Sequence, residues 1–161
     1  MTRTTLPPRE MVELAEATPG FMPEDEGTAL HDAAVRYLGG GVGVEIGTYC
    51  GRSTVYLGAA AKATGGGRSS PWTTTTGRKN TSPAGNTTTN RSSIPHTGLL
   101  DTAGRLRHTL ADADLEQHVV AVLGASVQVA GFWRTPASFV FIDGGHSSAA
   151  AQADYDGWAR W

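Results

Sequence analysis

The chain has 161 residues, of which 39% are hydrophobic and 17% are charged, and its formal net charge is -2. This length predicts one domain, 1–161, and the small charge excludes a general attraction to nucleic acid or to an anionic membrane. A single cysteine, Cys50, excludes an internal disulfide framework and a multi-cysteine zinc site. Because the chain has neither an apolar run of about 18 residues nor an apolar stretch near its start, we expect a cytoplasmic protein.

Two helices are expected within the first 40 residues. Pro8 favours the start of the first helix, which Pro19-Gly20 would end. Gly27-Thr28 precedes the second helix, and Gly39-Gly40-Gly41 would end it. Apolar residues at helical spacing predict the buried faces: Met11, Leu14 and Ala15 in the first helix, and Leu30, Ala33, Ala34, Tyr37 and Leu38 in the second.

The remaining elements alternate between strands and helices. Residues 42–46 form a short β-rich run, and the run 55–63 favours a helix. A helix is expected over 99–115, continuously apolar strands over 119–123 and 137–142, and a last helix after Ser147. This alternation predicts an α/β fold, a Rossmann-like parallel sheet with helices on both faces.

Residues 68–95 interrupt this pattern. Of these 28 residues, 13 are Ser or Thr, and none is Leu, Val, Asp or Glu. A stretch of this composition is expected to be disordered, although the fold requires its second strand near here.

The genetic code offers an alternative explanation of 68–95, namely translation out of frame. The codons for Trp72 and Thr73, read one base earlier, always contain GAC, which encodes aspartate. With GC-rich codons the neighbouring residues become a valine-rich strand that ends in that acid. A compensating shift near Ile94-Pro95 would restore the frame.

Gly47 and Gly51 lie four residues apart between an expected strand and an expected helix. Glycines let the backbone approach a bound molecule, and a helix N-terminus presents free N–H groups. The spacing matches neither the Gly-x-Gly-x-x-Gly of dinucleotide sites nor the Gly-Lys-Ser/Thr of phosphate loops, which disfavours a nicotinamide-dependent oxidoreductase. A carboxylate-bearing ligand fits better, and a plain tight turn is the alternative.

Three motifs together resemble the class I S-adenosylmethionine (SAM) dependent methyltransferases. Residues 44–54, Val-Glu-Ile-Gly-Thr-Tyr-Cys-Gly-Arg-Ser-Thr, are similar to the first motif of catechol O-methyltransferase and of bacterial small-molecule O-methyltransferases. Residues 124–126, Gly-Ala-Ser, resemble the segment of that family at the adenine edge. Residues 141–146, Phe-Ile-Asp-Gly-Gly-His, resemble the end of its fifth strand. The resemblance covers 27–66 and 99–161.

The resemblance implies a SAM site and the part each residue plays in it. Glu45 would lie under the methionine part of SAM and attract its ammonium, while Tyr49 and Ser53 would hold the amino-acid tail and Ser126 would touch adenine. The family's second strand ends in an acid that binds the ribose, and this chain has the uncharged Thr73 there. The cofactor-binding residues expected in this way are Glu45, Gly47, Thr48, Tyr49, Gly51, Ser53, Ala125 and Ser126.

Asp143 and His146 are the expected catalytic residues. Asp143 matches the metal-ligand aspartate of the catechol-type enzymes, where Mg²⁺ would hold and acidify the hydroxyl of a small-molecule acceptor. His146 falls where those enzymes carry a lysine general base, and a histidine can serve near neutral pH. The alternatives are a strand-end turn residue for Asp143, and for His146 a helix residue without chemistry or a neighbour of the metal or of adenine.

The other chemically notable residues are given structural interpretations. Cys50 is expected to pack as a small apolar residue. Arg52 is expected to be a surface or ligand-edge charge, and Asp154 and Asp156 are expected on a helix surface. Packing roles are expected for the tryptophans Trp133, Trp158 and Trp161.

The family's sheet has seven strands, and this chain ends after the helix that follows the expected fifth. A truncated sheet would expose pairing groups at its edge, so we expect poor stability, and aggregation or a homo-oligomer formed through that edge. The sequence therefore predicts a SAM-dependent methyltransferase domain acting on a small-molecule hydroxyl. The alternatives are a non-catalytic SAM-binding module and an inactive remnant of such an enzyme.

Overall fold

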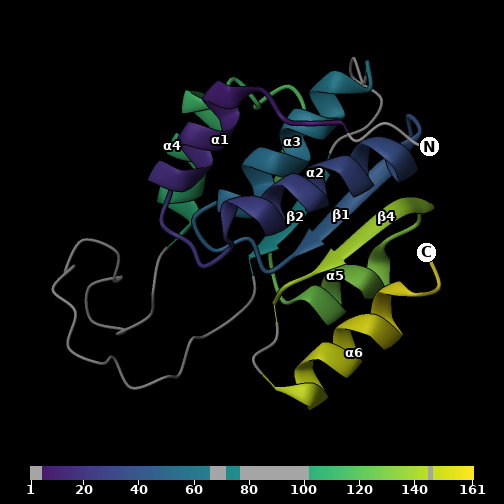
Figure 1. Ribbon diagram of the computed structural model, residues 1–161. Coiled ribbons are helices and arrows are strands. Elements are labelled where there is room, and N and C mark those ends of the chain that lie inside the picture. The colour runs from purple at the N-terminus through teal and green to yellow at the C-terminus, as the bar shows by residue number, and fades with distance from the viewer. Residues whose placement is uncertain (1–4, 66–71, 77–101, 145–146) are drawn as a thin grey trace, which may run out of the picture.

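The computed structural model describes residues 5–65, 72–76, 102–144 and 147–161 (Figure 1). Within these ranges helices and strands alternate from β1 onward, as the sequence predicts. The elements are α1 (Arg9–Ala17), α2 (Glu24–Leu38), β1 (Val42–Ile46), α3 (Arg52–Ala63), β2 (Trp72–Thr76), α4 (Ala103–Asp112), β3 (Val119–Leu123), α5 (Ser126–Phe132), β4 (Ala137–Ile142) and α6 (Ser148–Trp158).

The described strands form one sheet with the order β3-β2-β1-β4, and every neighbouring pair is parallel. The predicted parallel α/β sheet is therefore confirmed. The strand that precedes Asp143 is β4, the fourth described strand rather than the fifth, and it pairs directly with β1. No helix in the described part of the chain is long and apolar enough to cross a membrane.

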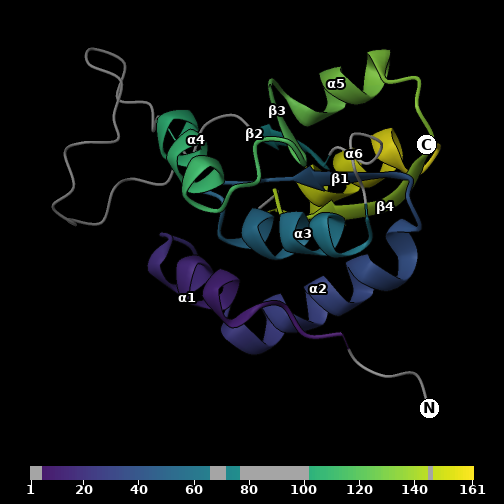
Figure 2. The ribbon, with the colours of Figure 1, turned by 90° about the horizontal axis from the view of Figure 1, so that it is seen from above.

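Helices cover both faces of the sheet (Figure 2). The helices α1, α2 and α3 lie on one side, and α5 and α6 lie on the other. The sheet therefore has a hydrophobic core on each face. Side chains alternate along β1, and Val44 and Ile46 pack in the core formed with Val129 of α5 and Trp158 of α6. Glu45, between Val44 and Ile46, therefore points to the opposite face, toward α3.

The N-terminal helices agree with prediction apart from one boundary and one side chain. Helix α2 begins at Glu24, five residues before the start expected directly after Thr28, and its acidic first turn favours a helix N-terminus. Tyr37 is 66% exposed, so its assignment to the buried stripe was wrong, and His31 is buried there instead. Gly39 adopts a left-handed conformation with φ 53° and ends the helix, as predicted.

A second strand does lie where the fold requires one. Residues 72–76 form β2 between β1 and β3, with Thr73 opposite Val44 and Thr75 opposite Ile46. Thr73 is thus the second residue of a strand that continues to Thr76, because β-branched threonines favour extended backbone. The expectation that Thr73 occupies the strand-end position of the ribose-binding acid is therefore wrong. The rest of 68–95 lies outside the described residues.

Candidate functional site

The carboxyl ends of β1 and β4 lie side by side, and β4 is the edge strand of the described sheet. After β1 the chain passes through α3 to β2 on one side of β1, whereas β4 pairs with β1 on the other side. The strand order therefore reverses between β1 and β4. In open α/β sheets, ligands bind in the crevice outside the carboxyl ends of the strands at such a reversal.

The turns after these two strands touch each other through backbone. The Asp143 amide donates a hydrogen bond of 2.8 Å to the Ile46 carbonyl. Gly47 has φ +97°, and a Cβ on it would lie 2.3 Å from the Gly144 Cα. Only glycine is tolerated at this position, because both the positive φ and the close approach exclude a side chain. Gly47 thereby brings Asp143 beside the glycine turn that precedes α3.

A buried carboxylate lies under that turn. Glu45 is 0% exposed and accepts hydrogen bonds from three hydroxyl groups. Thr48 donates to its Oε2 at 3.2 Å and Thr54 donates to the same oxygen at 2.6 Å, while Ser53 donates to its Oε1. The acid of β1 therefore connects the turn to the first turn of α3, and these four residues are called the Glu45 cluster below.

Burial is the main influence on the protonation of Glu45. Desolvation raises the pKa of Glu45, the hydrogen bonds from Ser53, Thr54 and Thr48 oppose that rise, and the nearby charge of Asp143 adds to it. Thr54 was not predicted as part of the site. Its position one residue after Ser53, in the first turn of the helix that follows the glycine turn, is the feature of the sequence that indicates it.

A cavity of about 370 Å³ opens next to Asp143. Its walls come from the loop between α1 and α2, from α2 and from the end of β4. They are lined by Phe21, Met22, Glu26, Leu30, Phe141, Ile142 and Asp143. Tyr49 of the glycine turn has φ 50°, and its ring centroid lies 5.9 Å from that of Phe21. The cavity therefore adjoins both the turn and the strand-end aspartate.

The cavity residues of the 18–23 loop were missed by the sequence interpretation. Phe21 is 88% exposed although it is aromatic, and it lies with Met22 between Pro19 and Pro23. Because prolines favour turns, an apolar pair between two prolines indicates side chains carried by a loop rather than by the face of a helix. That pattern is the signal from which the two residues could have been found.

The predicted adenine-edge residues lie at the carboxyl end of β3. Ala125 caps the start of α5, and Ser126 is its first residue. The Ser126 hydroxyl is buried and accepts a hydrogen bond of 2.8 Å from the indole nitrogen of Trp158. The packing role predicted for Trp158 is confirmed, since its side chain is fully buried in the second core.

The described residues contain a single strand-end carboxylate suited to a metal, Asp143, with Glu26 lining the same cavity. No group of three or more His, Cys, Asp or Glu side chains that could hold a metal ion occurs in the described ranges. The protein side chains seen here would therefore supply only a minority of the ligands of a divalent cation. His146 lies outside the described residues.

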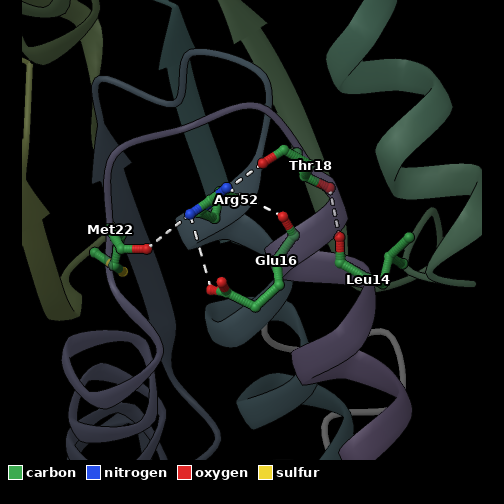
Figure 3. A network of polar contacts seen from close by, with 5 residues as sticks. All are labelled: Leu14, Glu16, Thr18, Met22 and Arg52. Carbon is green, nitrogen blue, oxygen red and sulfur yellow. Dashed lines mark hydrogen bonds and ion pairs between the residues drawn. The ribbon is translucent and has the colours of Figure 1, made fainter.

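The interpretation of Arg52 as a surface charge was wrong, whereas its alternative as a charge at the ligand edge stays a prediction. Its guanidinium donates to the backbone carbonyls of Thr18 at 2.9 Å, Met22 at 3.1 Å and Glu16 at 3.1 Å, and its side chain is only 18% exposed (Figure 3).

The prediction of a helix-surface position is wrong for Asp154, which is buried. Asp156 is exposed, as predicted, and accepts a hydrogen bond from Gln152. Cys50 is buried, and burial raises the pKa of its thiol, in agreement with a packing role.

Comparison with known proteins identifies related folds and a family. A family model described as a methyltransferase domain matches residues 44–161. The fold is similar to that of the SAH-bound methyltransferase PaMTH1 from Podospora anserina, with a TM-score of 0.63 and 15% identity, covering 97% of this chain and 59% of that one. It is also similar to an O-methyltransferase from Bacillus cereus in complex with SAH, with a TM-score of 0.57 and 18% identity, covering 91% of this chain and 59% of that one. At these identities the two likenesses show the fold alone, and the chain spans less than two thirds of the length of either protein.

Proposed function

The chain belongs to the methyltransferase-domain family, and on that premise we propose that it binds SAM at the glycine turn and transfers the methyl group to a hydroxyl of a small molecule. The observation that carries this proposal is the pairing of β1 with β4, which brings their carboxyl ends together. There the Gly47–Gly51 turn over the Glu45 cluster adjoins Asp143 and the 370 Å³ cavity. The SAH named for PaMTH1 and for the Bacillus cereus enzyme supports the choice of cofactor.

The proposed cofactor site uses the glycine turn at the end of β1 and the residues at the end of β3. The open glycine turn, with Thr48 and Tyr49, would hold the amino-acid tail of SAM, since a helix N-terminus favours a carboxylate. Glu45 lies beneath that turn, where its charge would favour the ammonium of the cofactor. Ser53 acts in this proposal through Glu45, to which it donates. Ala125 and Ser126 would border adenine from the end of β3.

The methyl transfer is an in-line displacement at the methyl carbon of SAM. The acceptor oxygen forms a bond to the methyl carbon as the bond between that carbon and the SAM sulfur breaks, so alignment supplies most of the acceleration. The cavity would orient the acceptor, because its apolar walls fit a ring or chain and Asp143 can accept a hydrogen bond from a hydroxyl. His146 is proposed as the base that takes the hydroxyl proton.

A divalent cation belongs to the proposal only as a ligand of Asp143. Mg²⁺ usually retains several waters and binds through one or two carboxylates plus substrate. Asp143, with Glu26 in the same cavity, is compatible with that weak mode and not with a preformed cage. When bound there, Mg²⁺ would hold and acidify the acceptor hydroxyl. A homo-oligomer likewise remains a prediction, which sedimentation of the purified chain would test.

The test is methyl transfer from radiolabelled SAM to a panel of phenols and ortho-diphenols, with and without Mg²⁺. Asp143→Asn removes the strand-end charge with little change of shape, and Asp112→Asn removes an exposed charge at the end of α4 as the matched control. The proposal predicts transfer by the unmodified chain and by the control, with a loss of at least about 100-fold in Asp143→Asn. Binding of SAH without transfer to any hydroxyl would contradict the proposal and favour a non-catalytic SAM-binding module.

A further inference from the structure

Arg52 lies where the proposed cofactor turn meets the loop that forms one wall of the cavity. It is the first residue of α3 and directly follows Gly51, the last glycine of the turn. Its side chain leaves this turn and extends toward the loop between α1 and α2, residues 18–23, called the wall loop below (Figure 3). The wall loop carries Phe21 and Met22, which line the cavity.

The guanidinium binds the wall loop through two backbone carbonyls and the end of α1 through a third. Nε donates to the Thr18 carbonyl, Nη1 to the Met22 carbonyl and Nη2 to the Glu16 carbonyl. The Glu16 carbonyl belongs to the last turn of α1, where a helix leaves its carbonyls without partners and favours a cation. Since α1 has no basic residue in its own last turn, Arg52 supplies that charge from another helix.

The loop backbone also packs directly on the Arg52 side chain. A Cβ built on Gly20 would lie 2.8 Å from the Cβ of Arg52 and 3.2 Å from its Nε. The ion pair to Glu16 is weaker, with 3.8 Å between Nη1 and Oε1, and the Glu16 side chain is 43% exposed to water. The three carbonyl contacts therefore carry the interaction, and they require the fork of donors that arginine has and lysine lacks.

From this geometry we propose that Arg52 is a positioning residue for the acceptor: it holds the wall loop, with Phe21 and Met22, at the distance from the glycine turn that forms the acceptor side of the cavity. This inference rests on the proposed function, because it assigns the turn to the cofactor and the cavity to the acceptor. Arg52 itself touches neither, and it acts by fixing the wall. The contact of the Phe21 and Tyr49 rings, one from each side of this junction, follows from the same placement.

The test compares Arg52→Met and Arg52→Lys with Arg36→Met. Arg36, whose side chain is 38% exposed, forms an ion pair of 2.5 Å with Asp32 on α2 and serves as the matched control. We expect amide hydrogen exchange at Thr18, whose N–H donates to the Leu14 and Ala15 carbonyls, to accelerate roughly tenfold or more in Arg52→Met, with exchange in β1 and α3 unchanged. Arg52→Lys should restore part of the protection, and Arg36→Met should leave the wall loop unchanged.

Binding and kinetics then separate positioning from general stability. With SAH as the probe of the cofactor site and 3,4-dihydroxybenzoate as the acceptor, Arg52→Met should raise the acceptor KM at least about tenfold and change SAH affinity less than about threefold. A variant that was merely less stable would show the same fraction of activity lost at every acceptor concentration. Unchanged wall-loop exchange, or equal losses in acceptor KM and SAH affinity, would overturn the inference. Failure of the unmodified chain to bind SAH would instead contradict the proposed function, and the exchange measurement would still decide the role of Arg52 in placing the loop.

Discussion

Replacement of Glu45 is the perturbation whose outcome the site geometry defines most sharply. In Glu45→Leu the hydroxyls of Thr48, Ser53 and Thr54 lose a common buried acceptor. Glu45→Gln is the matched variant, because its amide oxygen can accept from Thr48 and Thr54 at the Oε2 position while its NH₂ group donates to the Ser53 hydroxyl oxygen. The two variants therefore differ in hydrogen-bonding capacity and hardly in size.

The magnitude follows from the number of donors left without a partner. A buried polar group without a hydrogen bond costs about 1–3 kcal/mol. Ser53 and Thr54 form the two shorter bonds, so Glu45→Leu should lower the free energy of unfolding by about 2–6 kcal/mol, whereas Glu45→Gln should lower it by less than about 1 kcal/mol. Against a total stability of about 5–15 kcal/mol for a typical domain, the first loss threatens folding at room temperature.

Urea denaturation followed by circular dichroism at several pH values measures both variants. Burial raises the pKa of Glu45 above its ordinary value of 4.5, so the folded chain keeps a proton that the unfolded chain releases. The stability of the unmodified chain relative to Glu45→Gln should therefore be greatest below pH 4.5. It should fall, by at most about 1.4 kcal/mol per pH unit, as the pH rises toward the raised pKa. If Glu45→Leu unfolds within about 0.5 kcal/mol of the unmodified chain, or if Glu45→Gln loses as much as Glu45→Leu, the reasoning about the cluster is refuted.

Other predictions concern packing, proton release, the cation and the coding sequence. Gly27→Ala places a Cβ 2.2 Å from the Tyr56 ring and should destabilise the chain by about 1–3 kcal/mol, whereas Gly104→Ala, with open space in α4, should stabilise it by about 0.5–1 kcal/mol in the same melting assay. If the ammonium of SAH favours ionised Glu45, then binding should release a proton and tighten as the pH rises between the bound and free pKa values. Calorimetry in buffers of different ionisation enthalpy should detect that proton, and heats independent of the buffer would contradict the coupling. EDTA should reduce methyl transfer and leave SAH affinity unchanged, because the cation is proposed to contact Asp143 and the acceptor and not the cofactor; full activity in EDTA would remove Mg²⁺ from the proposal. Independent sequencing of the coding DNA should show single-base differences that bracket residues 68–95, and an unchanged reading frame would contradict translation out of frame.

The elements of the fold were predictable where hydrophobic periodicity was strong. The apolar strands 119–123 and 137–142 were assigned correctly, because continuously apolar runs between helices indicate a parallel sheet. The start of α2 was placed too late because its acidic first turn carries no apolar residue to mark it. Tyr37 fits the helical period but lies at the margin of the stripe, where the ring is exposed.

The candidate site was predictable in its backbone and less so in its side chains. The glycine turn follows from spacing, since positive φ at Gly47 and Gly51 is a local requirement of the chain. The contacts of Arg52 connect residues thirty or more positions apart, so nothing local to the sequence distinguishes it from a surface charge. Thr73 was misplaced because a run of threonines does not indicate where its strand ends, and the register with β1 was needed to show it.

Binding of SAH to the whole chain tests the central claim most directly. Isothermal calorimetry should give one site per chain. At an SAH concentration one hundred times Kd the folded state should gain about 2.7 kcal/mol, which corresponds to a rise in Tm of about 5–10 °C for a domain of this size. A chain that is folded by circular dichroism and shows neither heat of binding nor a rise in Tm with millimolar SAH would contradict the assignment of the glycine turn as a SAM site.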